Sequence, residues 1–171
     1  MTHTLYRVLS YILLPVVILL AAFDVVALFV ALSNPPMLLG VFMVACVAFY
    51  VFGSFRFFNN AVVLGKNCKP SLKDWVKVNA IVTLIFALMM LFQVAVILMN
   101  PALLQKALDE TAAQMQGSTA QPFSKETLLS TAKGFMYFFM ILSVILIIHI
   151  VITFRYLKQY RNLFSDSTKQ P

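Results

Sequence analysis

Four long runs of apolar residues alternate with shorter polar connections along the chain. They cover residues 8–32, 37–55, 78–99 and 135–154, and each holds about 19 to 25 residues. A helix of that length rises roughly 30 Å, which is the thickness of the hydrocarbon core of a bilayer. A lone segment in lipid can satisfy its own backbone hydrogen bonds only as a helix. The pattern therefore predicts an all-α membrane protein with four transmembrane helices in an up-down bundle.

The first two connections carry signals for where helices end and begin. The sequence at 34–36, Asn-Pro-Pro, predicts a tight turn between the first two spans because proline does not continue a helix. Asn59 and Asn60 are expected to end the second helix. Ser71 is the expected N-cap of the third helix, which would then begin at headgroup depth before it enters lipid.

The third connection, residues 100–134, is the longest and has a pattern of its own. Apolar residues recur at helical spacing over 102–116, with charged and amide side chains off that face. This spacing predicts an extra amphipathic helix in an outer loop. Ser124 is expected to cap the helix that runs on into the fourth span.

The distribution of Lys and Arg predicts the orientation. The loop between the second and third spans and the tail at 155–171 are strongly basic, whereas three lysines balance three acidic residues within 100–134. Basic segments stay on the cytoplasmic side. Both termini should therefore be cytoplasmic, with the whole chain, 1–171, forming one integral domain of a cell membrane. The chain lacks an Asn-x-Ser/Thr sequon, which agrees with a bacterial inner membrane.

Composition and missing motifs narrow the function. Apolar residues make up 61% of the chain and charged residues only 11%, which excludes a soluble globular protein. The basic residues that give the net charge of +7 lie between the apolar runs, and they do not form a patch on a nucleic-acid-binding fold. A single histidine in the spans does not suffice for a bis-histidine haem, and Cys46 and Cys68 have no metal or redox spacing. Hydrolase and nucleotide-binding motifs are also missing. We therefore expect no enzyme, no cofactor, no metal and no nucleic acid partner.

Asp24 is the only acidic residue inside a predicted span. It precedes Asn34 by ten residues, which places it roughly 15 Å from the outer boundary, near the middle of the membrane. A charge at that depth costs several kcal/mol unless it is paired or neutralised. Asp24 is therefore either a proton or cation site or a hydrogen-bonding group that joins two helices, with Gln93 as the preferred partner.

His149 defines a second polar position in the spans. It lies roughly 9 Å from the inner boundary, at a depth shared by Tyr50 and Thr83. These three residues predict an inner polar layer that is separate from Asp24. A histidine in such a layer either hydrogen-bonds between helices or takes part in a proton relay.

The basic loop and tail provide candidate contacts outside the spans. These residues either only fix the topology or also bind anionic lipid headgroups or an acidic partner. The candidate contacts are Lys66, Lys69, Lys73, Arg155, Lys158 and Arg161.

Two functions fit these features. The first is a non-enzymatic multi-pass membrane protein that acts as an accessory, assembly or interaction subunit, held by helix packing against a protein partner or a second copy in the bilayer. The second is a small proton- or cation-coupled transporter or channel subunit that uses Asp24. The polar groups in the spans lie at different depths, which favours the first.

Overall fold

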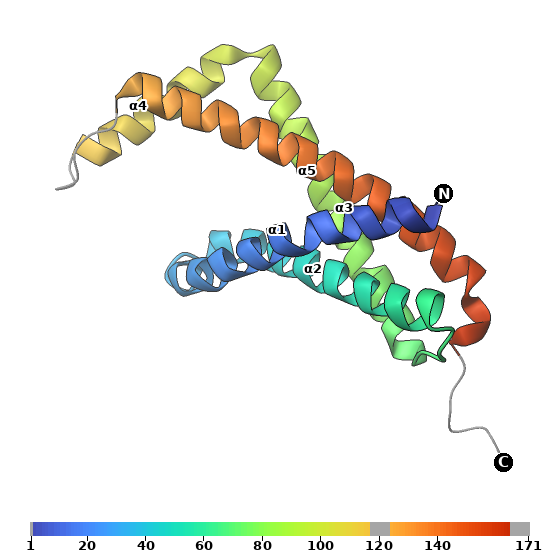
Figure 1. The fold of residues 1–171 in the computed structure, drawn as a ribbon. Helices are drawn as coiled ribbons and strands as arrows, with labels where there is room; N and C mark the ends of the chain where they lie inside the picture. The colour runs from blue at the N-terminus through green and yellow to red at the C-terminus, as the bar shows by residue number, and fades with distance from the viewer. Residues whose placement is uncertain (1, 117–123, 165–171) are drawn as a thin grey trace. The chain divides into compact units, whose positions relative to one another are not determined.

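The structure, a computed structural model, describes residues 2–116 and 124–164, and every regular element in these ranges is helical (Figure 1). The elements are α1 (Thr2–Ala31), α2 (Pro35–Phe57), the π-helix η1 (Phe58–Val63), α3 (Pro70–Met99), α4 (Pro101–Gln116), α5 (Lys125–Gln159) and the 3-10 helix η2 (Arg161–Leu163). Four helical segments are long and apolar enough to cross a membrane: His3–Ala31, Pro35–Val63, Pro70–Met99 and Glu126–Gln159. The predicted all-helical class with four such helices is confirmed.

The chain divides into two compact units. The first comprises Met1–Phe86 and Ile145–Pro171, and the second comprises Ala87–Val144. The first unit holds α1, α2, η1, the beginning of α3 and the end of α5, while the second holds α4 and the remaining parts of α3 and α5. The up-down arrangement of all four spans in one domain stays a prediction.

A tight turn joins α1 to α2, as the Asn-Pro-Pro sequence predicts. The backbone N–H of Ser33 donates to the carbonyl of Val30 at 3.1 Å, and that of Asn34 donates to Ala31 at 3.0 Å. Proline suits the first helical turn because its missing N–H would have no partner there. The two helices then run side by side in opposite directions (Figure 1).

The second helix does not end at the two asparagines. Its path continues through η1, because Phe58 and Ala61 bury their side chains on the protein side while Asn59 and Asn60 are half-buried. The α-helical part of the second span thus ends at Phe57, just before the asparagines, but the asparagines do not end the helical path. The helical path ends before Gly65, whose φ of +60° lies in the left-handed region that glycine adopts without strain.

The other helix boundaries agree with the sequence in part. Ser124 caps α5, since its hydroxyl oxygen accepts the backbone N–H of Thr127 at 3.2 Å. Helix α3 begins at Pro70, so Ser71 lies in its first turn and the predicted N-cap position was wrong by two residues. A helix is present where the sequence predicts one over 102–116, although its amphipathic role stays a prediction.

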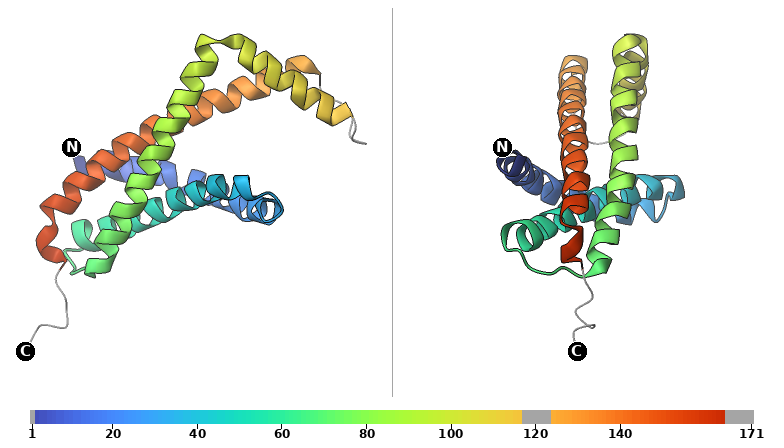
Figure 2. Two further views of the ribbon diagram at one scale, coloured as in Figure 1. Left: turned by 180° about the vertical axis from the view of Figure 1, so that it is seen from behind. Right: turned by 90° about the vertical axis from the view of Figure 1, so that its right-hand side faces the viewer.

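The core of the first unit is made of buried stripes at helical spacing. On α3 the buried residues of this unit are Val76, Asn79, Ala80 and Thr83, and on α5 they include Leu146, Ile150 and Thr153. Spacings of three and four residues keep each stripe on one helix face. The end of α5 lies beside the start of α1 and the second half of α2 (Figure 2). This core positions the polar side chains described below.

Gly53 permits the close approach of α2 to α3. A Cβ atom on Gly53 would lie 3.1 Å from Cγ2 of Val76 and 3.5 Å from Cδ1 of Trp75. A Cβ atom on Gly40, in the same helix, would meet nothing within 4 Å. Helix α2 thus contains one glycine, Gly53, that is closely packed against another helix, and a second, Gly40, with open space around it.

We predict that Gly53→Leu lowers the free energy of unfolding by about 1–3 kcal/mol, because the added side chain must push α2 away from α3. Gly40→Leu is the matched control and should unfold close to the wild type. Thermal unfolding in mild detergent, followed by circular dichroism, measures both variants. Equal stability of the two variants would contradict the α2–α3 packing.

Candidate functional site

The three intramembrane candidates fall in different parts of the structure. Asp24 on α1 and His149 on α5 belong to the first unit, whereas Gln93 on α3 is an exposed residue of the second. The predicted hydrogen bond between Asp24 and Gln93 therefore stays a prediction. The first unit contains the polar groups whose geometry is described here.

His149 lies at the centre of a fully buried polar cluster. Its Nδ1 is 2.7 Å from the hydroxyl oxygen of Tyr50, and its Nε2 is 3.0 Å from Oγ of Ser10. The ring of Tyr6 stacks on the imidazole, with 4.5 Å between ring centroids. None of these side chains exposes more than 1% of its surface. The cluster therefore joins α1, α2 and α5.

Thr153 completes the network around the imidazole. Its hydroxyl donates to the carbonyl of His149 at 2.8 Å and lies 2.9 Å from the hydroxyl of Tyr50. Tyr6 is 3.3 Å from the same threonine and donates to the carbonyl of Ser54, also at 3.3 Å. The cluster thus holds five side chains: Tyr6, Ser10, Tyr50, His149 and Thr153.

A neutral imidazole has both of its ring nitrogens paired in either tautomer. If Nδ1 carries the proton, it donates to Tyr50, Tyr50 donates to Thr153, and Ser10 donates to Nε2. If Nε2 carries the proton, it donates to Ser10, and Tyr50 donates to Nδ1. Both ring nitrogens are therefore paired without a charge, which is the arrangement that stabilises a buried polar group.

The inner polar layer predicted from the sequence is present in part. Tyr50 hydrogen-bonds His149, so their predicted proximity is confirmed. Thr83 instead donates to the carbonyl of Asn79 at 2.7 Å and reaches the carbonyl of Cys46 at 3.5 Å, and thereby ties α3 to α2.

The sequence analysis missed Tyr6, Ser10 and Thr153. The missed signal is a pair of polar residues four apart, on one helix face, in each spanning helix. These pairs are Tyr6 with Ser10, Tyr50 with Ser54, Asn79 with Thr83, and His149 with Thr153.

Asp24 stands apart from this cluster. It is half-buried on the stripe of α1 that includes Val17, Leu20, Ala27 and Ala31, at spacings of three and four residues. Within the first unit, as far as the structure describes it, its carboxyl has no hydrogen-bond or ion-pair partner. Ser10 precedes it by fourteen residues, roughly 21 Å along the helix axis.

The candidate cationic contacts gather at one end of the first unit. Lys66 and Lys69 are exposed on the connection between η1 and α3, and Lys73 is half-buried in the second turn of α3. The three from the C-terminal part, Arg155, Lys158 and Arg161, are all exposed. A cavity of about 660 Å³ beside the connection is lined by charged, amide and aromatic side chains that include Arg56, Asn60, Lys69 and Trp75.

The two cysteines are free thiols, as their separation in sequence suggests. Cys68 is buried in the connection, where its backbone N–H donates to the carbonyl of Leu163 at 2.7 Å. Burial raises the pKa of the Cys68 thiol, and the nearby Arg56 guanidinium offsets part of that rise. Within 2–116 and 124–164, no three His, Cys, Asp or Glu side chains gather as metal ligands.

We predict that Tyr50→Phe lowers the free energy of unfolding by about 1–2 kcal/mol, because His149 Nδ1 loses its partner inside the core. Tyr137→Phe removes the same hydroxyl from an exposed position on α5 and is the control. Thermal unfolding in detergent compares the two. If both changes have the same small effect, the cluster does not stabilise the fold.

We also predict slow alkylation of Cys68 in a Cys46→Ala background. The thiolate is the reactive form, so a raised pKa leaves little of it at neutral pH, and labelling should speed up only at higher pH. The comparison is a chain that lacks Cys68 and carries Lys66→Cys at an exposed position of the same loop. Its cysteine should react with maleimide about ten times faster at pH 7. Equal rates would contradict the burial of Cys68.

No family model, no curated protein and no solved structure matches the chain.

Proposed function

We propose that the chain is a non-enzymatic, multi-pass subunit that assembles with a protein partner in a cell membrane. The observation that supports this is the Asp24 carboxyl, which lies in a membrane-spanning helix and has no partner in its own unit among the residues described. One other buried polar group, the hydroxyl of Tyr156, also has no hydrogen-bond partner, but Asp24 is the acidic residue inside a span, where the lack of a partner costs most.

The surroundings of Asp24 leave room for a second chain. Asp24 is only half-buried, and Leu28, one turn further along the same side of α1, exposes 40% of its surface. A carboxyl group in such a segment costs several kcal/mol unless another group pairs with it. A helix from another chain that brings a hydrogen-bond donor or a cation to this depth would remove that cost.

The topology that accompanies this proposal is the one that the basic residues predict. The four spans form an up-down bundle with both termini in the cytoplasm, in a bacterial inner membrane. In this arrangement α4 is an amphipathic helix on the outer side, where its charged residues face water. Asp24 then lies near the middle of the membrane.

The geometry gives less support to a transporter. A transport route usually places several polar groups along one path through the membrane. The polar cluster around His149 is closed, because its side chains are buried and bond one another, and Asp24 is roughly 21 Å from Ser10 along α1. Nothing polar on α1 lies between Ser10 and Asp24 except Tyr11, which is exposed.

We predict that the chain leaves its native membrane in mild detergent as a heteromeric complex of fixed stoichiometry. Asp24→Leu should weaken this complex about tenfold, because one intramembrane hydrogen bond contributes about 1–2 kcal/mol. Asp24→Asn keeps a hydrogen-bonding group and should retain the complex. Native mass spectrometry measures all three proteins.

Val25→Leu, which changes an exposed apolar neighbour, is the matched control and should behave as wild type. Proteoliposomes provide the opposing measurement. A proton or cation flux that needs the Asp24 carboxylate would overturn assembly in favour of transport. A complex that survives Asp24→Leu unchanged would show that Asp24 does not hold the partner.

A further inference from the structure

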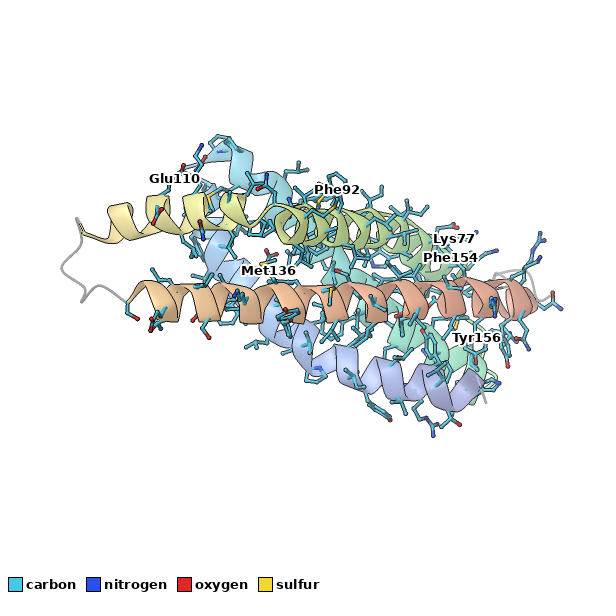
Figure 3. All side chains as sticks on the ribbon, turned by 90° about the horizontal axis from the view of Figure 1, so that it is seen from above. Lys77, Phe92, Glu110, Met136, Phe154 and Tyr156 are labelled. Carbon is cyan, nitrogen blue, oxygen red and sulfur yellow. The ribbon has the colours of Figure 1, made fainter. Side chains whose placement is uncertain are left out.

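A small cationic cavity lies between the beginning of α3 and the end of α5. Its volume is about 330 Å³, and it is lined by Lys73, Lys77, Phe154, Leu157, Lys158 and Arg161. Four of these six residues are cations, and no acidic side chain is among them. Figure 3 shows Lys77 and Phe154 near the same end of the two helices. We call this feature the α3–α5 cationic cavity.

The positive charges that line the α3–α5 cationic cavity repel one another. Lys73 and Lys77 are four residues apart on α3, a spacing at which like charges on a helix repel. Lys158 and Arg161 add two more positive charges from α5 and η2. The ammonium of Lys73 is also held over the ring of Phe164, 5.7 Å from its centre. Such a cluster is stabilised by an anion placed among the four cations.

The floor of the cavity is apolar. Leu157 is buried and Phe154 is half-buried, while Lys158 and Arg161 are exposed at the mouth. One turn further into the spans, Ile81 follows Lys77 on α3 and is exposed, at 52%. On α5 the residue one turn before Phe154 is Val151, which is exposed at 46%. A cationic mouth therefore continues into apolar surface at the end of two helices that can cross a membrane.

This combination suits an amphiphilic anion better than a soluble one. A free phosphate would use the four cations but not the apolar floor or the exposed surface beyond it. A diacyl lipid would use both, because its phosphate lies at headgroup depth and its acyl chains extend along the spans. Basic cavities between transmembrane helices are known to hold anionic headgroups in this way.

We propose that the α3–α5 cationic cavity binds the phosphate of an anionic phospholipid, with the acyl chains along α3 and α5. Lys73, Lys77, Lys158 and Arg161 surround the phosphate, while Phe154 and Leu157 contact the glycerol and the first methylene groups. This site does not depend on Asp24 or on the assembly proposed above, since none of the residues that line it belongs to α1. The positive charge of these four residues then binds a ligand in addition to setting the topology.

The test uses the full chain in a nonionic detergent, titrated with phosphatidylglycerol or with phosphatidylcholine. Native mass spectrometry counts the lipids retained. We expect one phosphatidylglycerol to bind in preference to phosphatidylcholine. In the double variant with Lys77→Gln and Arg161→Gln, affinity for phosphatidylglycerol should fall roughly 10- to 30-fold.

The matched control removes the same charge from the same end of the molecule. Lys66→Gln with Arg155→Gln changes one lysine and one arginine that are exposed and do not line the cavity. This variant should bind phosphatidylglycerol as the wild type does. An equal loss in both double variants would mean general attraction to a basic surface and would overturn the site.

Two further measurements complete the test. Inorganic phosphate at the lipid's concentration should not displace the lipid, and displacement would identify a soluble anion as the ligand and overturn the lipid proposal. Lys158→Gln alone, at an exposed position, should lower affinity about fivefold with unchanged helix content by circular dichroism. Unchanged affinity in this folded variant would contradict the proposal even if the double variant failed to fold.

Discussion

A polar side chain in a membrane-spanning helix must find its partner inside the protein, and the first unit is organised around that requirement. His149 meets it by pairing one ring nitrogen with α1, through Ser10, and the other with α2, through Tyr50. Hydrophobic burial alone would select no particular register here, because lipid is as apolar as the helix surfaces. A shift of one residue along α5 would rotate His149 by about 100° and leave both nitrogens without partners. The cluster therefore fixes both the depth and the rotation of the three helices.

The same requirement distinguishes the other polar features of the chain. The cluster around His149 is satisfied internally, whereas the Asp24 carboxyl has no hydrogen-bond or ion-pair partner in the described part of its unit. The cations of the α3–α5 cationic cavity lie at the ends of the spans, where water and headgroups are within reach and a lysine side chain can extend toward them. The buried cluster, the half-buried carboxyl and the exposed cations thus have three different surroundings within the first unit. Each environment sets which kind of partner is possible.

Much of this arrangement follows from the sequence, and the part that does not has a physical cause. Span number, helix class, the turn at Asn34 and the cap at Ser124 depend on local chemistry, so composition and spacing predict them. The continuation of α2 through η1 depends on burial of Phe58 and Ala61 against other helices, which no local pattern shows. The matching depths of Tyr50 and His149 along their spans correctly predicted that the two side chains lie close together. Depth alone also grouped Thr83 with them, because rotation about the helix axis, which depth does not give, decides which neighbour a side chain meets.

The surface of α3 shows how packing and charge are kept apart within one helix. At about 100° per residue, Val76, Ala80 and Thr83 form the buried face, and Lys73 and Lys77 lie at its edge toward α5. At this edge a lysine can pack its methylene stem on Phe154 and Leu157 while the ammonium stays outside the seam. The buried face of α3 is held to α2 by burial and by the hydrogen bond from the Thr83 hydroxyl to the carbonyl of Cys46, and neither needs the charge. The positive charge at the edge is therefore free to serve a ligand, and a change in that charge leaves this hydrogen bond in place.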